Sequence, residues 1–422
     1  MSSLSAAAAR DLPIAKLRAS FPTSWPMDRF GALFTESAER NGPSPKGIAL
    51  SVSEYHGVIP RDDSDGQRAS SDVSVYRVLH PGELAVNYMW LNRGGLGVSD
   101  LLGYISPAYK VYRIDPSVHS RFAHYLLRSR PYVSAFAALG TGVRPNSQMV
   151  DTVELNSLPV PSIPFATQRA IADYLDSETA EIDAMTADLD KMEALLTERR
   201  ATTVRSTMDR AAEFGRIPLG YVAQTVSGAT PSTSIAKYWA DSSESGIHWV
   251  SIGDMSSVPV VLETQKYVST EGRKAARLKV AGPGTVLFAM YGATLGAVSR
   301  LGVDACWNQA ILGVFPHESR LSPEFLESAL VALKPSLEAL HRGNTQNNLN
   351  AEQVKRLPIP LPPLEVQEAI SQELSEKTAE IDDMLADITE LRELLAERRA
   401  AVIAAAVTGQ IDIPTAEEPT HA

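Results

Sequence analysis

The chain has 422 residues, of which 44% are hydrophobic and 21% are charged, a composition that indicates a folded protein of two or three domains. No segment approaches the roughly 18 uncharged apolar residues that a membrane span needs, and the N-terminus has no basic start followed by an apolar stretch. We therefore expect a cytoplasmic protein without membrane contact. The single cysteine, Cys306, excludes an intramolecular disulfide and a multi-cysteine zinc site.

The distribution of charge divides the chain into four segments. The overall net charge of −11 opposes nucleic-acid binding, because phosphate contacts need Lys and Arg. However, residues 1–150 carry a net charge of +4 and residues 215–350 of +1, whereas residues 151–214 carry −7 and residues 351–422 carry −9. The negative charge lies in two segments, and the other two remain compatible with DNA binding.

The first segment, residues 1–150, alternates short apolar runs with Gly, Pro, Ser and Asn, which predicts short strands and turns. Apolar residues at helical spacing predict a helix over residues 121–139, late in the segment. We expect an α+β domain.

The second segment, residues 151–214, begins with a proline-dense stretch that disfavours helix, and then loses proline while gaining Ala, Leu, Glu and Asp. We predict a helix that starts near residue 165 and spans roughly 40 residues, or about 60 Å. Its apolar positions, spaced by three, four or seven, predict a coiled-coil seam. The seam consists of Ile171, Leu175, Ile182, Met185, Leu189, Met192 and Leu196.

The third segment, residues 215–350, has a different sequence from the first but repeats its outline at an offset of 202 residues. Residues 80–84 correspond to 282–286, and residues 106–109 correspond to 308–311. We expect a second α+β domain, with a late helix over residues 322–342.

The fourth segment, residues 351–422, repeats the second at an offset of 199, with 22 of the 44 positions from 158 to 201 identical. Neither helix can bury its apolar stripe alone, so we predict that the two copies pair as a coiled coil, ending near Gly409. The pattern leaves their orientation open, and two unrelated surface helices are the alternative that the duplication disfavours. The second seam consists of Ile370, Leu374, Ile381, Met384, Ile388, Leu391 and Leu395.

Three short motifs carry a resemblance to a known family. They are the leader Leu-Pro-Ile-Pro-Leu-Pro-Pro-Leu-Glu-Val-Gln at residues 357–367, the closing run at 404–413, and Gly-Ala-Thr-Pro at 228–231, which precedes two tryptophans. In this order the chain resembles the specificity subunits of type I restriction-modification systems, which are built as two target-recognition domains separated by two similar long helices. The first domain departs from the pattern, because it lacks a clear Gly-x-Thr-Pro opening.

The resemblance implies a division of labour. Each recognition domain would read one half of a split double-stranded DNA target, and the paired helices would hold the halves at a fixed distance. Two methyltransferase subunits, which carry S-adenosylmethionine, would dock on the chain, and motor-nuclease restriction subunits would join them. The chain itself would be a non-catalytic subunit with no cofactor of its own.

A search for catalytic motifs supports that expectation. The sequence has no phosphate-binding loop, no Gly-x-Gly-x-x-Gly turn and no Asn/Asp-Pro-Pro-Tyr/Phe methyltransferase motif. Asp254, Glu263 and Lys266 suggest a nuclease metal site only loosely, because the Glu-to-Lys spacing is one residue too long, and His119 and His124 are not spaced for one helix face. We expect no catalytic residue and no metal. A nuclease and a protein-binding scaffold with duplicated domains are the two alternatives.

Loops with side chains that can bond base edges or phosphate are the candidate DNA contacts. The basic run over residues 273–279 is the best single patch, and Trp239 and Trp249 are better explained as core residues than as base-stacking residues. In the first domain the candidates are Tyr55, His56, Asn87, Tyr88, Trp90, Asn92, Arg93, Arg144, Asn146 and Gln148. In the second domain they are Thr230, Ser232, Lys237, Tyr238, Arg273, Lys274, Arg277, Lys279, Tyr291, Asn308, Gln309, Arg342, Asn344, Gln346 and Asn347.

Overall fold

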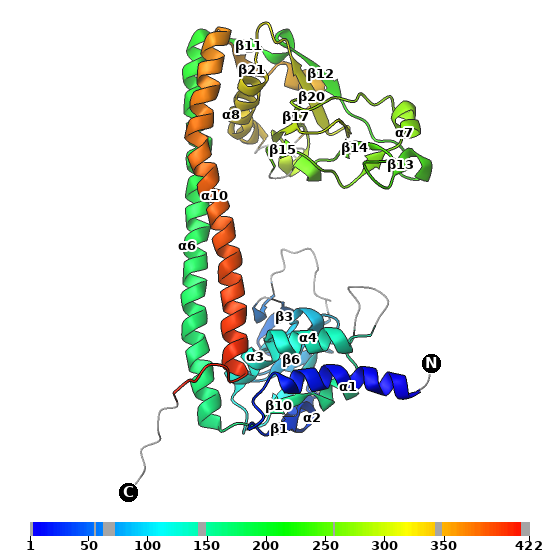
Figure 1. The fold of residues 1–422 in the computed structure, drawn as a ribbon, viewed down its shortest axis with the longest axis vertical. Coiled ribbons are helices and arrows are strands. Elements are labelled where there is room, and N and C mark those ends of the chain that lie inside the picture. Colours follow the sequence, from blue (N-terminus) through cyan, green and yellow to red (C-terminus); the bar gives the residue numbers. More distant parts are fainter. Residues whose placement is uncertain are drawn as a thin grey trace. The chain divides into compact units, whose positions relative to one another are not determined.

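The computed structural model describes residues 3–54, 56–61, 72–141, 149–255, 258–341 and 348–414 (Figure 1). The chain forms two compact units, of which unit 1 is Met1–Leu189 with Glu390–Ala422 and unit 2 is Asp190–Thr389. Two long helices, α6 (Phe165–Ala211) and α10 (Leu364–Val407), each contribute to both units. The predicted fold, two α+β domains joined by two long helices, is confirmed, and the boundary between the units falls inside both helices.

The domain of unit 1 has two four-stranded sheets, ordered β2-β9-β6-β7 and β4-β3-β8-β5. Residues along β6 alternate between the two faces of the first sheet: Ala85 packs with the second sheet, and Leu84 and Val86 pack with the helices. The elements, with η for a 3₁₀ helix, are α1 (Ser3–Ala19), β1 (Met27–Arg29), α2 (Phe30–Leu33), β2 (Phe34–Ser37), β3 (Ile48–Ser53), β4 (Gly57–Pro60), β5 (Arg77–Leu79), β6 (Leu84–Val86), η2 (Leu91–Arg93), β7 (Leu96–Val98), β8 (Gly103–Ile105), β9 (Lys110–Ile114), α3 (Ser120–Arg128), α4 (Arg130–Leu139), α5 (Thr152–Ser157) and β10 (Pro159–Pro161).

The domain of unit 2 has a five-stranded sheet, β12-β20-β17-β18-β15, and a four-stranded sheet, β13-β16-β14-β19. Leu287 of β17 packs into the core between these strands, and Phe288 packs with the helices on the other face. The elements are η3 (Ala212–Phe214), β11 (Arg216–Pro218), η4 (Leu219–Tyr221), β12 (Ala223–Ser227), η5 (Ala236–Tyr238), β13 (Trp239–Ala240), β14 (Ile247–Val250), η6 (Gly253–Met255), β15 (Val260–Val261), β16 (Tyr267–Val268), α7 (Thr270–Ala275), β17 (Val286–Ala289), η7 (Gly292–Thr294), β18 (Val298–Leu301), β19 (Ala305–Trp307), β20 (Ile311–Pro316), α8 (Pro323–His341), α9 (Ala351–Lys355) and β21 (Pro358–Pro360).

The two domains are copies of one another down to individual strand pairs. Ala85 pairs with Val111 in unit 1, and Leu287 pairs with Gly313 in unit 2, which preserves the offset of 202 on both strands. Gly82 and Gly284 precede these strands with φ of 82° and 86°, a left-handed conformation that glycine adopts without strain. The duplication predicted from the sequence is therefore observed in the backbone.

The two long helices run antiparallel within each unit, which settles the orientation that the sequence left open. In unit 2, Arg200 pairs with Asp382 at 2.6 Å and Arg210 with Glu373 at 2.7 Å, so the partners move backwards along α10 as α6 advances. In unit 1 the counterparts of Arg200 and Asp382 are Arg399 and Asp183, which also form an ion pair. The same ion pair therefore forms in both units: the arginine comes from α6 in unit 2 and from α10 in unit 1.

Burial along the helices shows a narrower seam than the sequence predicts. Leu374, Ile381 and Ile388, which are spaced by seven, are buried. By contrast, Met185 and Met384 are 37% and 38% exposed. A contact between two helices covers one narrow stripe, and a residue three positions later is rotated by about 60°, to the edge of that stripe. The buried seam positions are Ile171, Leu175, Ile182, Leu196, Leu374, Ile381 and Ile388; the half-buried ones are Leu189, Ile370 and Leu395; the exposed ones are Met185, Met192, Met384 and Leu391.

A buried glutamine fastens each domain to the start of its long helix. The Oε1 atom of Gln168 accepts a hydrogen bond from the His119 backbone N–H at 2.8 Å, and its Nε2 donates to the carbonyls of Ser117 and Ile163 at 3.0 and 2.8 Å. Gln367 repeats the arrangement with the N–H of Ser322 and the carbonyls of Arg320 and Pro362. The glutamine that survives in both repeats therefore has a structural role.

Candidate nucleic-acid interface

The basic run of unit 2 is built around α7. The Ser269 hydroxyl caps α7 by accepting a hydrogen bond from the Gly272 N–H at 3.1 Å, and the Ser269 N–H donates to the Tyr238 carbonyl at 3.0 Å. Gly272 lies so close to η5 that a Cβ there would be 2.2 Å from the Tyr238 carbonyl oxygen. This contact needs glycine, and it locks Lys237 and Tyr238 beside the cations of α7.

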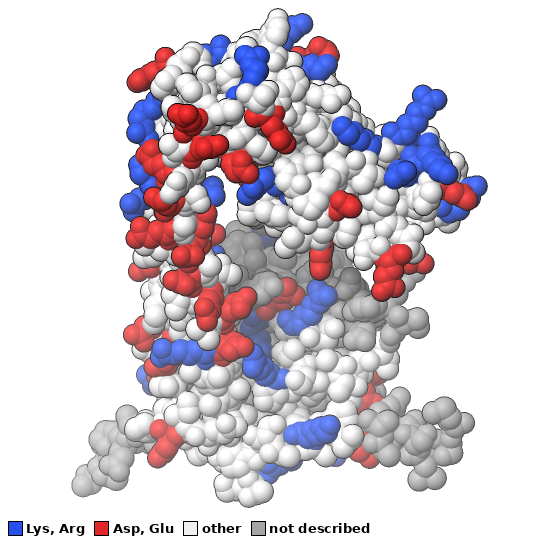
Figure 2. Space-filling view, turned by 45° about the horizontal axis from the view of Figure 1, so that its top comes forward, with Lys and Arg blue, Asp and Glu red and all other residues white. Residues whose placement is uncertain are grey.

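The cations themselves point outward. Arg273 is half-buried, Lys274, Arg277 and Lys279 are exposed, and Figure 2 shows basic side chains gathered on the part of unit 2 that carries α7. Arg277 ends the helix with a φ of 51°, and the Lys279 ammonium lies 3.7 Å from the centre of the Phe315 ring. A hydrogen bond from Lys237 to Glu271 raises the pKa of Lys237, so this side chain stays charged. The arrangement suits phosphate contacts.

The Gly-Ala-Thr-Pro motif forms a loop held by two indoles. The Trp249 Nε1–H donates to the Ala229 carbonyl at 3.1 Å, and the Trp239 Nε1–H donates to the Ser232 carbonyl at 3.2 Å. The Trp239 and Trp249 rings meet edge to face at 5.1 Å. Both tryptophans therefore support the loop, and Thr230 and Ser232 are exposed on it. The prediction of core residues holds for Trp249, which is 6% exposed, whereas Trp239 is half-buried.

The other candidates of unit 2 flank this loop. The Thr230 hydroxyl donates to the Gln309 side chain, while the Asn308 side chain accepts from the Ala310 N–H at 3.0 Å and so shapes its own turn. Tyr291 is exposed. Lys266 joins these candidates in the structure, with its ammonium 5.5 Å from the centre of the Trp239 ring. The sequence did not indicate this place, because it depends on strands that are not adjacent in sequence.

In unit 1, Arg128 ties together the two turns that carry exposed candidates. Its guanidinium donates to the Gly94 and Leu96 carbonyls at 2.8 and 2.6 Å, and to the Glu54 carbonyl at 2.9 Å. One of these turns carries His56 and the other carries Asn92 and Arg93. Arg128 is therefore a positioning residue that sequence reasoning missed, because its acceptors are backbone carbonyls far away in the chain.

Two candidates of unit 1 are corrected by their burial. Asn87 is 2% exposed, and its side chain accepts a hydrogen bond from the Met89 N–H at 3.2 Å. Tyr88 is 6% exposed, and its hydroxyl is bonded to the Tyr112 hydroxyl. Both side chains shape the interior and are not available to bases, whereas the neighbouring Trp90 is exposed. The candidates that lie outside the described residues are Tyr55, Arg144, Asn146, Gln148, Arg342, Asn344, Gln346 and Asn347.

The alternative of a nuclease metal site finds no support in the geometry. The Asp254 carboxylate accepts hydrogen bonds from the Ser251 N–H and hydroxyl and from the Gln265 N–H, at 2.6 to 3.0 Å. Within the described parts of the chain, no three His, Cys, Asp or Glu side chains are grouped closely enough to hold a metal ion. Across those same residues, no helix is both long and apolar enough to cross a membrane.

Comparison with known proteins decides the family of the second domain. Residues 213–390 match the model of the type I restriction modification DNA specificity domain. The chain carries a type I DNA specificity domain. This confirms the resemblance predicted from the sequence, and the matched residues include the basic run, the Gly-Ala-Thr-Pro loop and the leader of α10.

Two known proteins are also similar to the chain. The chain is 29% identical over 107 residues to the type I restriction enzyme EcoBI specificity subunit of Escherichia coli, a match that covers 25% of this chain and only 23% of that subunit. A solved structure from a study of complex assembly and conformational transition of the type I R-M system is similar with a TM-score of 0.61. At 19% identity over 93% of this chain and 99% of the other, it shows a shared fold.

Proposed function

We propose that this chain is the DNA specificity subunit of a type I restriction-modification complex and that each α+β domain reads one half of a bipartite target. The observation that carries the proposal is the match of residues 213–390 to the DNA specificity domain. The occurrence of the same strand pairing in unit 1 supports a second reader of the same kind. Phosphate contacts would orient each reader, and exposed polar side chains would select bases.

The two half-sites are proposed to differ. Strands β9 and β20 align at an offset of 202, so the turn before each strand holds the half-buried Asn308 and the exposed Gln309 in unit 2 but the half-buried Ser106 and the exposed Pro107 in unit 1. Asn and Gln can bond base edges in two places at once, whereas proline has no donor. Because the two domains have different side chains at the corresponding turn, we expect them to recognise two different DNA half-sites.

The long helices are proposed to set the spacing and to receive partner subunits. Three repeat positions leave an apolar side chain exposed in both copies: Met185 and Met384, Met192 and Leu391, and Leu195 and Leu394. Duplicated apolar positions favour two equivalent docking sites, which suits two methyltransferase subunits that carry S-adenosylmethionine. Motor-nuclease subunits would complete the complex in the cytoplasm, and this chain would catalyse no step and bind no cofactor.

The proposal is tested by co-expressing the chain with its methyltransferase subunit and mapping methylated adenines by long-read sequencing. We expect a split motif with a fixed gap that disappears when the chain is omitted. Variants of the chain that lack the cations of residues 273–279 should lose methylation while still binding the methyltransferase. An active methyltransferase in a stable complex that shows no motif would instead favour the protein-binding scaffold.

A further inference from the structure

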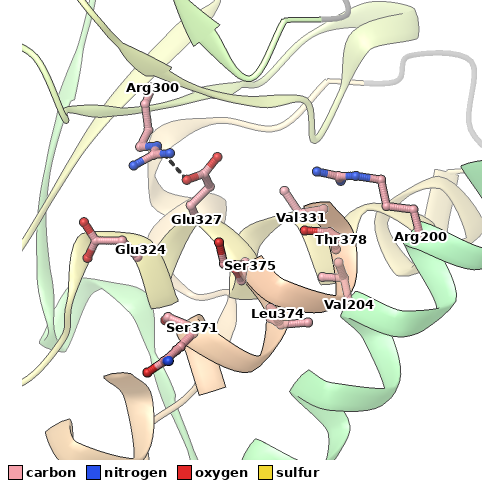
Figure 3. Close-up of a pocket in the computed structure, with 12 residues that line it drawn as sticks. Arg200, Val204, Arg300, Glu324, Glu327, Val331, Ser371, Leu374, Ser375 and Thr378 are labelled. Carbon is pink, nitrogen blue, oxygen red and sulfur yellow. Dashed lines mark ion pairs between the residues drawn. The ribbon is translucent and has the colours of Figure 1, made fainter. Parts of the chain in front are cut away.

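Unit 2 contains a cavity of about 380 Å³ between α6, α8 and α10 (Figure 3). Its apolar floor is formed by Val204, Val331 and Leu374. The hydroxyl-bearing side chains that line it are Ser328, Ser371, Ser375 and Thr378. The Ser371 hydroxyl is buried without a hydrogen-bond partner, which leaves a polar group for an occupant to satisfy.

Two arginines and two glutamates, Arg200, Arg300, Glu324 and Glu327, line this cavity. Arg300 pairs with Glu327 at 2.7 Å, as Figure 3 shows, and Arg200 pairs with Asp382 at 2.6 Å. Each guanidinium therefore already has a carboxylate partner. The Arg300 Nε–H, like the Ser371 hydroxyl, is buried without a hydrogen-bond partner, so an occupant with an acceptor oxygen would satisfy it. An apolar floor with neutral hydroxyls around it suits an uncharged aromatic group that carries a hydroxyl.

The place in unit 1 that corresponds to this cavity is occupied by an aromatic side chain with a hydroxyl group. The backbone N–H groups of His119 and Ser322 each donate a hydrogen bond to one of the two repeated glutamines. These equivalent bonds align α3 with α8, and in this alignment Tyr125 corresponds to Ser328. The Tyr125 hydroxyl donates to Asp176 at 2.8 Å and lies 3.1 Å from the Thr179 hydroxyl. Burial raises the pKa of Tyr125 to about 12, so the phenol stays neutral.

The cavity of unit 2 is therefore the site of a missing phenol. The counterparts of Asp176 and Thr179, at an offset of 199, are Ser375 and Thr378, and both line the cavity. Replacement of the tyrosine by Ser328 leaves the polar partners in place but removes the ring. A volume of about 380 Å³ lies within the range of pockets that bind small organic groups, roughly 300 to 1,000 Å³.

We propose that this cavity receives a tyrosine side chain from a partner protein that docks on unit 2, in the way that Tyr125 fills the equivalent place in unit 1. Tyrosine is enriched among the anchors that partner proteins insert into pockets. The inference rests on the proposed function only in taking that partner to be the methyltransferase subunit. It implies that the partner on unit 2 has an anchor pocket in addition to the apolar positions that both copies of the helix share, whereas Tyr125 occupies the corresponding place in unit 1.

The first test uses p-cresol, which is the tyrosine side chain without its backbone. Ligand-observed NMR with the full chain should show saturable binding of p-cresol, and toluene should bind at least about tenfold more weakly because the cavity hydroxyls stay unpaired. S328Y should abolish p-cresol binding, because the introduced ring fills the space from within. S319Y, at an exposed position outside the cavity, is the matched control and should bind p-cresol as before. Absence of p-cresol binding to the unaltered chain overturns the proposal.

The second test measures assembly. In a titration of the full chain with the methyltransferase subunit, S328Y should lower the affinity of the docking site on unit 2 at least about tenfold. S319Y should leave this affinity unchanged. Unchanged assembly of S328Y overturns the docking role even if p-cresol binds. If S328Y does not fold, T378V replaces it, since this isosteric change should weaken p-cresol binding without affecting toluene. Neither readout requires DNA, so failure of the methylation motif would refute the proposed function alone.

Discussion

At the scale of single residues, the hydrogen bonds of the two repeated glutamines explain why both copies of the repeat have a buried polar side chain at this position. Gln168 and Gln367 are 2% and 0% exposed, and each satisfies one backbone N–H and two carbonyls. A buried backbone group that loses its partner costs about 1 to 3 kcal/mol. Each glutamine therefore joins the backbone of its α+β domain to the first turn of the following long helix.

We expect Gln367→Ala to lower the free energy of unfolding of the chain by about 2 to 4 kcal/mol, because three backbone groups lose their hydrogen-bond partner at once. Urea denaturation followed by circular dichroism measures the change. Gln372→Ala, an exposed change on the same helix, is the control and should cost less than about 0.5 kcal/mol. Equal effects of the two substitutions would contradict the structural role.

His124 predicts a pH dependence of stability. Burial lowers its pKa from 6.5 to about 4, with Arg128 adding to the effect, so the folded chain keeps this imidazole neutral. Between these two pH values only the unfolded chain takes up the proton, and the free energy of unfolding should fall by up to about 3 kcal/mol as the pH is lowered through this window.

The measurement compares the unfolding of the unaltered chain with that of His124→Asn at pH 7.5 and pH 4.5. Asparagine keeps an acceptor for the Val98 N–H but does not titrate, so the variant should lose less stability on acidification. His56→Asn, on an exposed turn, should behave like the unaltered chain. A variant at position 124 that keeps the full acid sensitivity would rule out this histidine as its source.

At the scale of elements, the sequence predicted the helices and their duplication but not every break. The stretch 121–139 forms two helices, α3 and α4, because Ser129 is extended with ψ of 153° between them, and Pro131 lies in the first turn of α4, where proline is tolerated. The corresponding α8 runs through Pro335 without a break. Similar apolar spacing can thus give one helix or two, since packing decides where a proline is tolerated.

The sequence predicted the residue types of the candidate interface but not which of those side chains are exposed. The basic run of residues 273–279 needed only its charge to be recognised. Asn87 and Tyr88 have the same residue types as the exposed candidates, and only the folded structure reveals that they are buried. Arg128 and Lys266 were overlooked for the opposite reason, because their partners come from distant strands.

We expect the double change Lys274→Ala and Arg277→Ala to weaken DNA binding by the assembled complex for all sequences alike. Each lost phosphate contact should reduce the slope of log affinity against log salt by about 1, without changing the methylated motif. Fluorescence anisotropy over a salt series measures both effects. Lys377→Ala on α10, a cation paired with Glu373, should leave the slope unchanged. A change of motif would show base reading instead of phosphate contact.

At the scale of the whole molecule, the proposed function makes the helices a spacer between the two readers. Insertion of one heptad at matched positions in α6 and α10 adds about 10 Å of helix, which corresponds to about three base pairs of DNA. We expect the half-sites to stay the same and the gap between them to change. Methylation mapping of the insertion variant measures the gap, and an unchanged gap would refute the spacer role.

The continuity of α6 and α10 through both compact units has a thermodynamic consequence. Domains joined by a flexible linker unfold independently, but here each long helix continues from one unit into the other, so unfolding of one unit creates new helix ends at the boundary, where the packing between α6 and α10 is interrupted. Long helices in water are stable mainly through such packing. The two readers should therefore share one cooperative melting transition, so that a lesion in either domain lowers the amount of the other that the cell retains.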